Sequence, residues 1–244
     1  MLELNEYQNK GLVWYGCKNN DHIAKAKTHY NELDSRLHGG FPTSGIIEVK
    51  SMLGIGELRL ILPFLADQQG NQKAECVFIA PPIQLNAEFL LANGLELSQT
   101  LIIPAYDPAE ALWAAEQCLN SGCCSTVVLW QAELSIKQVR RLMLACEQGA
   151  SSLILIRNSQ AKSKGTRFLS LPSALSLSLH AHPMGIKVKI DKQKGGIGSS
   201  PFIINMTEKW QDFTITNSEQ AISREPSNVL AFPNNTKLDI HEQS

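Results

Sequence analysis

Short apolar runs alternate with helical patterns through the middle of this 244-residue chain, and that alternation constrains the fold more than any other feature. Short, mainly apolar segments have the composition of buried strands, at 45–49, 76–80, 101–103, 126–130 and 153–156. Helical patterns separate them, at about 56–68, 86–94, 107–122 and 135–146. Strands that alternate with helices at this spacing predict an α/β domain with a mainly parallel sheet.

Two of the expected helices begin with capping signatures. Asp107 can cap the helix that follows it, Pro108 suits the first helical position, and Glu110 is placed to complete a capping box. Ser135 and Gln138 form a second capping box by their spacing. The sequence therefore predicts helices that open next to these residues.

The pattern changes after residue 156. Apolar and polar residues alternate with strand period at 175–181 and 186–191, and a last apolar run follows at 201–204. We expect these segments to form antiparallel strands at one edge of the parallel sheet.

The expected organisation is an N-terminal segment and linker at 1–32, a core at 33–213, and a mostly disordered C-terminal tail at 214–244. The N-terminal segment around Trp14 is either a separate docking element or an extra edge strand of the same domain. The tail holds an apolar island with Leu230 and Phe232. That island either contacts the chain's own domain or docks a partner.

Composition excludes several classes of protein. The 22 basic and 23 acidic residues give a net charge of −1, so bulk charge does not indicate a nucleic-acid binder. There is no apolar run of the roughly 20 residues that a membrane span needs, and no signal-peptide pattern at the start. The six cysteines lack metal-ligand spacing. We expect a cytoplasmic protein with no metal, no cofactor and no membrane contact.

Residues 45–60 combine an apolar strand, a glycine-bearing turn and an amphipathic helix, which is the architecture of a phosphate-binding loop. Such a loop reads Gly-x-x-x-x-Gly-Lys-Ser/Thr, and the equivalent positions here are Ser51, Gly56, Glu57 and Leu58. Exchanging the lysine for Glu57 changes its interaction with a phosphate from roughly −4 to +4 kcal/mol at about 4 Å and an effective dielectric near 20. Leu58 offers no hydroxyl to Mg²⁺. The scaffold is present and its phosphate ligands are missing.

The order of motifs across about 33–205 resembles the ATPase core of RecA recombinase. The likeness is carried by the runs at 33–34, 39–42, 45–49, 78–79, 127–129, 188–194 and 202–204. It implies a RecA-like P-loop NTPase core in which Pro82 replaces the catalytic carboxylate and Trp130, or its neighbour Gln131, replaces the Walker B aspartate. With Glu57 also changed, the resemblance implies a degenerate nucleotide site and a protein that is not an enzyme. We expect Glu57 and Arg59 to face solvent or a partner.

A second resemblance is to the ImuA family of translesion-synthesis accessory proteins and its SulA-like relatives. It is carried by residues 13–14, 54–60, 79–82, 111–119, 121–122 and 140–142. The ImuA resemblance implies an accessory role in SOS-induced mutagenic translesion synthesis. The implied partners are an ImuB-type Y-family-like protein, an error-prone C-family DNA polymerase and RecA itself.

Two alternatives remain. A SulA-type cell-division inhibitor would bind the tubulin-like protein FtsZ. An ATP-dependent RecA-like DNA-binding protein is disfavoured by Glu57, Leu58 and Pro82. A basic loop at 157–167 falls where the RecA resemblance implies a DNA-binding loop, and at most weak phosphate contact is expected from its basic residues, Arg157, Lys162, Lys164 and Arg167.

Overall fold

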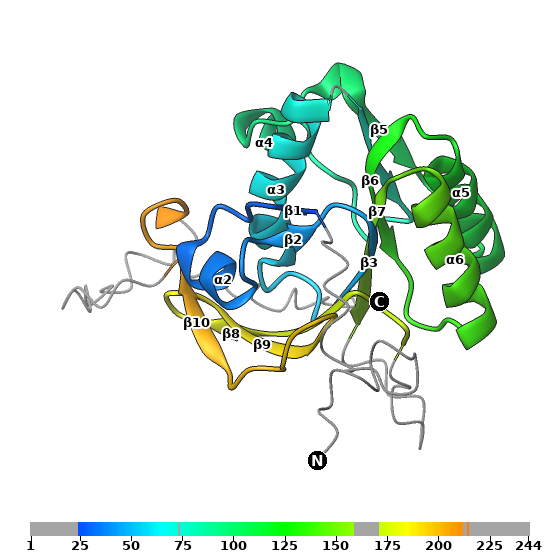
Figure 1. Cartoon of the computed structure of the whole chain (residues 1–244). Helices are drawn as coiled ribbons and strands as arrows, with labels where there is room; N and C mark the ends of the chain where they lie inside the picture. Colours follow the sequence, from blue (N-terminus) through cyan, green and yellow to red (C-terminus); the bar gives the residue numbers. More distant parts are fainter. Residues whose placement is uncertain (1–23, 73, 159–170, 212–213, 215–244) are drawn as a thin grey trace, which may run out of the picture.

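Eight strands form one sheet in the computed structural model, which describes residues 24–72, 74–158, 171–211 and 214 (Figure 1). From one edge to the other the order is β10 (Phe202–Asn205), β9 (Gly185–Gln193), β8 (Leu175–His182), β3 (Gly45–Ser51), β7 (Ser152–Asn158), β6 (Cys124–Trp130), β4 (Glu75–Ile79) and β5 (Thr100–Ile103).

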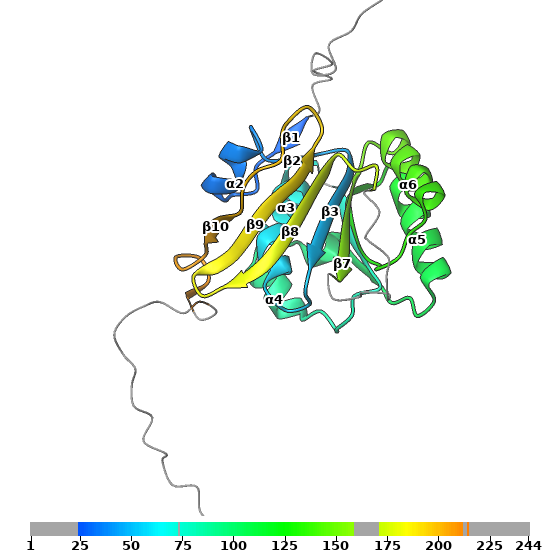
Figure 2. The same cartoon turned by 90° about the horizontal axis from the view of Figure 1, so that it is seen from below.

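Neighbouring strands from β8 to β5 pair in parallel, whereas β9 pairs antiparallel with both β8 and β10. The register places Ile47 of β3 between Ile154 of β7 and Leu175 of β8. Figure 2 shows β8, β9 and β10 side by side at one edge. The predicted α/β class, with a mainly parallel sheet and antiparallel strands at one edge, is confirmed.

Helices cover both faces of the parallel part of the sheet (Figure 1). One face carries α3 (Glu57–Gln72) and α4 (Ala87–Ala92), and the other carries α5 (Pro108–Asn120) and α6 (Ile136–Gln148). Alternate strand residues enter the two resulting cores, since successive side chains of a strand point to opposite faces. Ile47 packs in the core on the α3 side and Ile46 in the core on the α5 side. A short 3₁₀ turn, η1 (Leu97–Gln99), leads into β5.

The helix starts lie where the sequence predicts them. Ser135 and Gln138 form the reciprocal capping box of α6. Asp107 caps α5 by accepting a hydrogen bond from the amide of Ala109, at 3.2 Å, rather than by a reciprocal pair with Glu110.

The fold begins before residue 33, where the sequence suggests a linker. Strand β1 (Lys25–Ala26) pairs with β2 (Phe41–Pro42) in a separate two-stranded sheet, and α2 (Asn31–Arg36) follows β1. Although this stretch is polar in composition, its Tyr30 is buried in the core. The Tyr30 hydroxyl donates to the carbonyl of Arg59 at 2.7 Å and accepts from Trp210 Nε1 at 3.0 Å. Residues 1–23 and 215–244 lie outside the described residues.

Among the described residues, no helix combines the length and apolarity that crossing a membrane requires.

Tyr30→Ala should lower the free energy of unfolding by about 3 kcal/mol, because it removes a buried ring and both hydrogen bonds of its hydroxyl. Urea denaturation followed by circular dichroism measures the change. The matched control is Tyr106→Ala, because Tyr106 is 97% exposed and its loss should leave stability unchanged. Equal midpoints for both variants would show that Tyr30 does not anchor the fold.

Candidate functional site

The candidate site lies at the carboxyl end of β3, the central strand of the sheet. β3 has β7 on one side and β8 on the other, and in open α/β sheets ligands bind at the carboxyl end of the strands where the connections diverge. The chain leaves β3 through a short loop and enters α3 at Glu57. Gly54 and Gly56 have φ angles of 81° and 107°, which favour glycine strongly. The predicted strand, glycine turn and helix are therefore present.

The Glu57 carboxylate occupies the anion-binding position of this loop. Gly54 N donates to Oε1 at 3.1 Å, and Gly56 N donates to Oε2 at 3.2 Å. Glu57 is 4% exposed, so the expectation that it faces solvent or a partner is wrong. Its burial has a physical reason: backbone N–H groups that converge in a loop attract an anion, and the start of a helix favours negative charge.

The other loop positions also lack free ligands for a nucleotide. Ser51 is buried, and its hydroxyl donates to the carbonyl of Met52 at 2.7 Å. Leu58 is partly buried and packs against the core on the α3 side. Arg59 is half-buried, with a guanidinium nitrogen 3.4 Å from the carbonyl oxygen of Ile55. A phosphate entering the loop would meet the Glu57 carboxylate.

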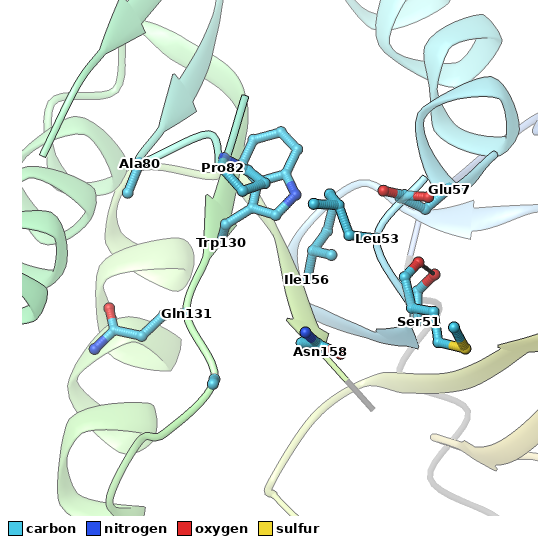
Figure 3. A pocket seen from close by; sticks show the side chains of 11 residues that line it. Ser51, Leu53, Glu57, Ala80, Pro82, Trp130, Gln131, Ile156 and Asn158 are labelled. Atoms are coloured by element: carbon cyan, nitrogen blue, oxygen red, sulfur yellow. Dashed lines mark hydrogen bonds between the residues drawn. The ribbon is translucent and has the colours of Figure 1, made fainter. Parts of the chain in front are cut away.

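Pro82 and Trp130 lie at the carboxyl ends of two neighbouring strands, beside the loop that follows β3. Pro82 follows β4, and Trp130 is the last residue of β6. Together with Glu57 and Leu53, both line two adjoining pockets of about 220 and 320 Å³; Figure 3 shows the smaller pocket. Trp130 Nε1 is buried and has no acceptor among the described residues. The positions expected to be degenerate are thus brought together around these two pockets.

The larger pocket is mainly apolar. Sequence reasoning missed the residues that give it this character, Leu53, Ile83, Leu85 and Phe89. Leu53 and Ile83 are also largely exposed, although each follows a buried strand within a few residues. The sequence did contain a signal for this pocket: large apolar side chains in the short loops that follow the strands at their carboxyl ends. This edge is suited to protein or peptide contact more than to phosphate.

Arg157 is not available to DNA, contrary to the expectation for the basic loop. It lies on β7 and is buried, with Nη1 2.6 Å from Glu48 Oε1 and Nε donating to the carbonyl of Ala132 at 2.9 Å. Ser176 donates to the other carboxylate oxygen of Glu48, at 2.7 Å. A buried carboxylate requires such partners, and Arg157 therefore stabilises Glu48 inside the domain.

The polar cluster continues across β3, β8 and β9. Lys50 lies 3.3 Å from the carboxylate of Asp191, which also accepts a hydrogen bond from Ser178. Burial alone would raise the pKa of Asp191, but the Ser178 hydrogen bond and the charge of Lys50 outweigh it and lower the pKa below its ordinary value. Within the described residues, no group of three His, Cys, Asp or Glu side chains could hold a metal ion.

The other residues predicted to make contacts lie outside the described residues. They are the three remaining basic residues of the loop, Lys162, Lys164 and Arg167, and the apolar residues proposed for partner binding, Trp14, Leu230 and Phe232.

Arg157→Met should reduce the free energy of unfolding by about 3 kcal/mol, since it leaves the buried Glu48 carboxylate without its main partner. The double variant Glu48→Leu/Arg157→Met removes both charges and should recover much of that loss. Urea denaturation compares the three proteins. A single variant as stable as the parent would contradict the structural role of the pair.

ATP with Mg²⁺ should show no micromolar binding and no hydrolysis, because Glu57 already occupies the loop amides. Calorimetric titration and phosphate release measure the two properties. Glu57→Lys alone should not give hydrolysis, because Leu58 and Pro82 do not offer the groups that phosphoryl transfer needs. Micromolar affinity of the unmodified chain would contradict this account of the loop.

The chain is similar to known proteins over its central half. The family model described as cell division inhibitor SulA matches residues 48–152. The cell division inhibitor SulA of Edwardsiella piscicida is 30% identical over 125 residues, which are 50% of this chain and 73% of that protein. The SulA of Photorhabdus laumondii is 28% identical over 125 residues, covering 51% of this chain and 70% of that protein. The crystal structure of SulA from Pseudomonas aeruginosa has 32% sequence identity and a TM-score of 0.42, over 46% of this chain and 97% of that one. Because the Edwardsiella piscicida protein is 30% identical and covered over 73% of its length, the chain belongs to the SulA family.

Proposed function

We propose that this protein is a cytoplasmic, non-enzymatic inhibitor of cell division in the SOS response and that it acts by binding FtsZ. The observation that carries the proposal is the match of residues 48–152 to the model described as cell division inhibitor SulA. This places division inhibition ahead of the lesion-bypass role that the ImuA resemblance implies.

The matched segment contains the surface on which such a contact would depend. It runs from β3 to the start of β7 and includes the loops that follow β3, β4, β5 and β6. Tyr106, after β5, is 97% exposed, and Trp113, on α5, is 64% exposed. Exposed aromatic side chains supply much of the binding energy at protein interfaces. We propose that Tyr106 and Trp113 contribute to the FtsZ contact.

The absence of catalysis in this proposal follows from the loop chemistry. Glu57 accepts hydrogen bonds from the amides that would hold a phosphate. By the RecA resemblance, Pro82 and Trp130 stand at the positions of the groups that would act on that phosphate. An inhibitor that acts by occupying a surface of its target needs none of those groups. Its effect should therefore be stoichiometric rather than catalytic.

The purified chain should block GTP-dependent polymerisation of FtsZ at near-equimolar ratios, measured by light scattering and sedimentation. Tyr106→Ala/Trp113→Ala should weaken inhibition by about tenfold or more, since two exposed aromatic contacts are removed without a change in the core. The control is Ile197→Ala, which removes a 92% exposed side chain outside the matched segment. Unimpeded polymerisation at excess inhibitor would contradict the FtsZ proposal.

A second candidate is the ImuA-type role in mutagenic translesion synthesis. The observation in its favour is that folded elements outside residues 48–152 are integral to the domain. β8, β9 and β10 extend the main sheet beside β3, while Tyr30 and Phe41 are buried in the core on the α3 side. These additions support a RecA-like core that has lost nucleotide chemistry. Its partners would be an ImuB-type protein, a C-family polymerase and RecA, with DNA contact weak or indirect.

Expression in cells separates the two candidates. Filamentation without added lesion bypass supports division inhibition, whereas damage-induced mutagenesis without filamentation supports the ImuA-type role. Pull-down with FtsZ and with an ImuB-type protein provides the corresponding physical readout. Capture of the ImuB-type protein without FtsZ would contradict the division-inhibitor proposal and support the role in translesion synthesis.

A further inference from the structure

The apolar pocket beside the degenerate loop lies next to the point where the described chain ends. Phe89 of α4 lines this pocket of about 320 Å³, and its ring packs against Trp210 with centroids 5.9 Å apart. Trp210 is also joined to the pocket wall through Tyr30, which donates to the carbonyl of Arg59. Two contacts thus join Trp210, near the end of the described chain, to residues that line the pocket.

The chain beyond Trp210 contains one strongly apolar island. Residues 229–233 read Val-Leu-Ala-Phe-Pro, within a segment otherwise rich in Asn, Ser, Glu and Gln. The island carries no charge, and most of the pocket wall is apolar, including Leu53, Ile83 and Phe89. An uncharged apolar segment suits this pocket, whereas a nucleotide does not.

The island can reach the pocket within its own chain. It begins 15 residues after Thr214 (229 − 214), a separation that can span up to about 50 Å. Because the island and the pocket belong to one chain, docking is intramolecular, and tethered segments reach effective concentrations in the millimolar range. Even a weak site would therefore be filled by its own chain in preference to a dilute partner.

We propose that residues 229–233 of the same chain dock in the apolar pocket formed by Leu53, Ile83, Leu85 and Phe89, with Leu230 and Phe232 as the inserted side chains. The pocket next to the loop between β3 and α3 then serves as an internal peptide site. This inference does not depend on the identity of the protein's partner.

Photo-cross-linking in the full-length chain tests the proposal. Phe232 is replaced by p-benzoylphenylalanine, which keeps an aromatic side chain at that position, and cross-linked peptides are mapped by mass spectrometry. The expected product is an intramolecular link to the peptides that carry Leu53, Ile83 or Phe89. The same probe at Gln220, nearer to Thr214 but in a polar stretch, should give little product in those peptides.

Ile83→Asp should reduce the yield at least about tenfold, because a carboxylate at the pocket mouth opposes apolar docking. Ile83 is 57% exposed, so thermal unfolding should be unchanged and loss of the cross-link would not reflect unfolding. Ile197→Asp is the matched control and should leave the yield intact. Links to other surfaces, links only between two chains, or a yield unaffected by Ile83→Asp would overturn the proposal. No FtsZ is present, so this result is independent of the division-inhibitor proposal.

Discussion

The arrangement of the site depends on the hydrogen bonds between the Glu57 carboxylate and the amides of Gly54 and Gly56. A loop that joins a strand to a helix in this way exposes N–H groups that require an acceptor. In a nucleotide-binding protein that acceptor is a phosphate, whereas here it belongs to the first residue of α3. The fold therefore keeps its central turn without a ligand, and the surrounding edge becomes available for apolar contacts.

The buried Glu57 carboxylate explains how this fold can suit a function that needs no nucleotide. With the loop satisfied by Glu57, the remaining edge residues need not bind a nucleotide, and apolar residues such as Leu53 and Ile83 fill it. The parallel sheet still positions the loops, since the strand ends share one edge. The domain thus has a rigid frame for the surfaces that we propose to contact another protein, which suits a SulA-family inhibitor.

The sequence predicts the fold better than it predicts the site. Apolar strand runs and capping signals are local, so they correctly indicate the parallel sheet and the starts of α5 and α6. The burial of Glu57, Arg157 and Tyr30 depends on partners far away in the chain or on the shape of a loop, and no local pattern reveals it. Glu57 and Leu58 indicate from the sequence alone that the loop lacks the residues of a phosphate-binding loop. That the Glu57 carboxylate accepts hydrogen bonds from the loop amides could be seen only in the structure.

The most direct test of the central claim is amide hydrogen exchange at Gly54 and Gly56, measured by NMR in the parent chain and in Glu57→Ala. Hydrogen bonds to a charged group contribute about 1.5–3 kcal/mol, so their removal should accelerate exchange at both amides by roughly ten- to a hundredfold. Glu57→Gln, which keeps an oxygen acceptor, should give an intermediate rate. Equal exchange rates in the parent and Glu57→Ala would contradict the claim that the Glu57 carboxylate occupies the loop.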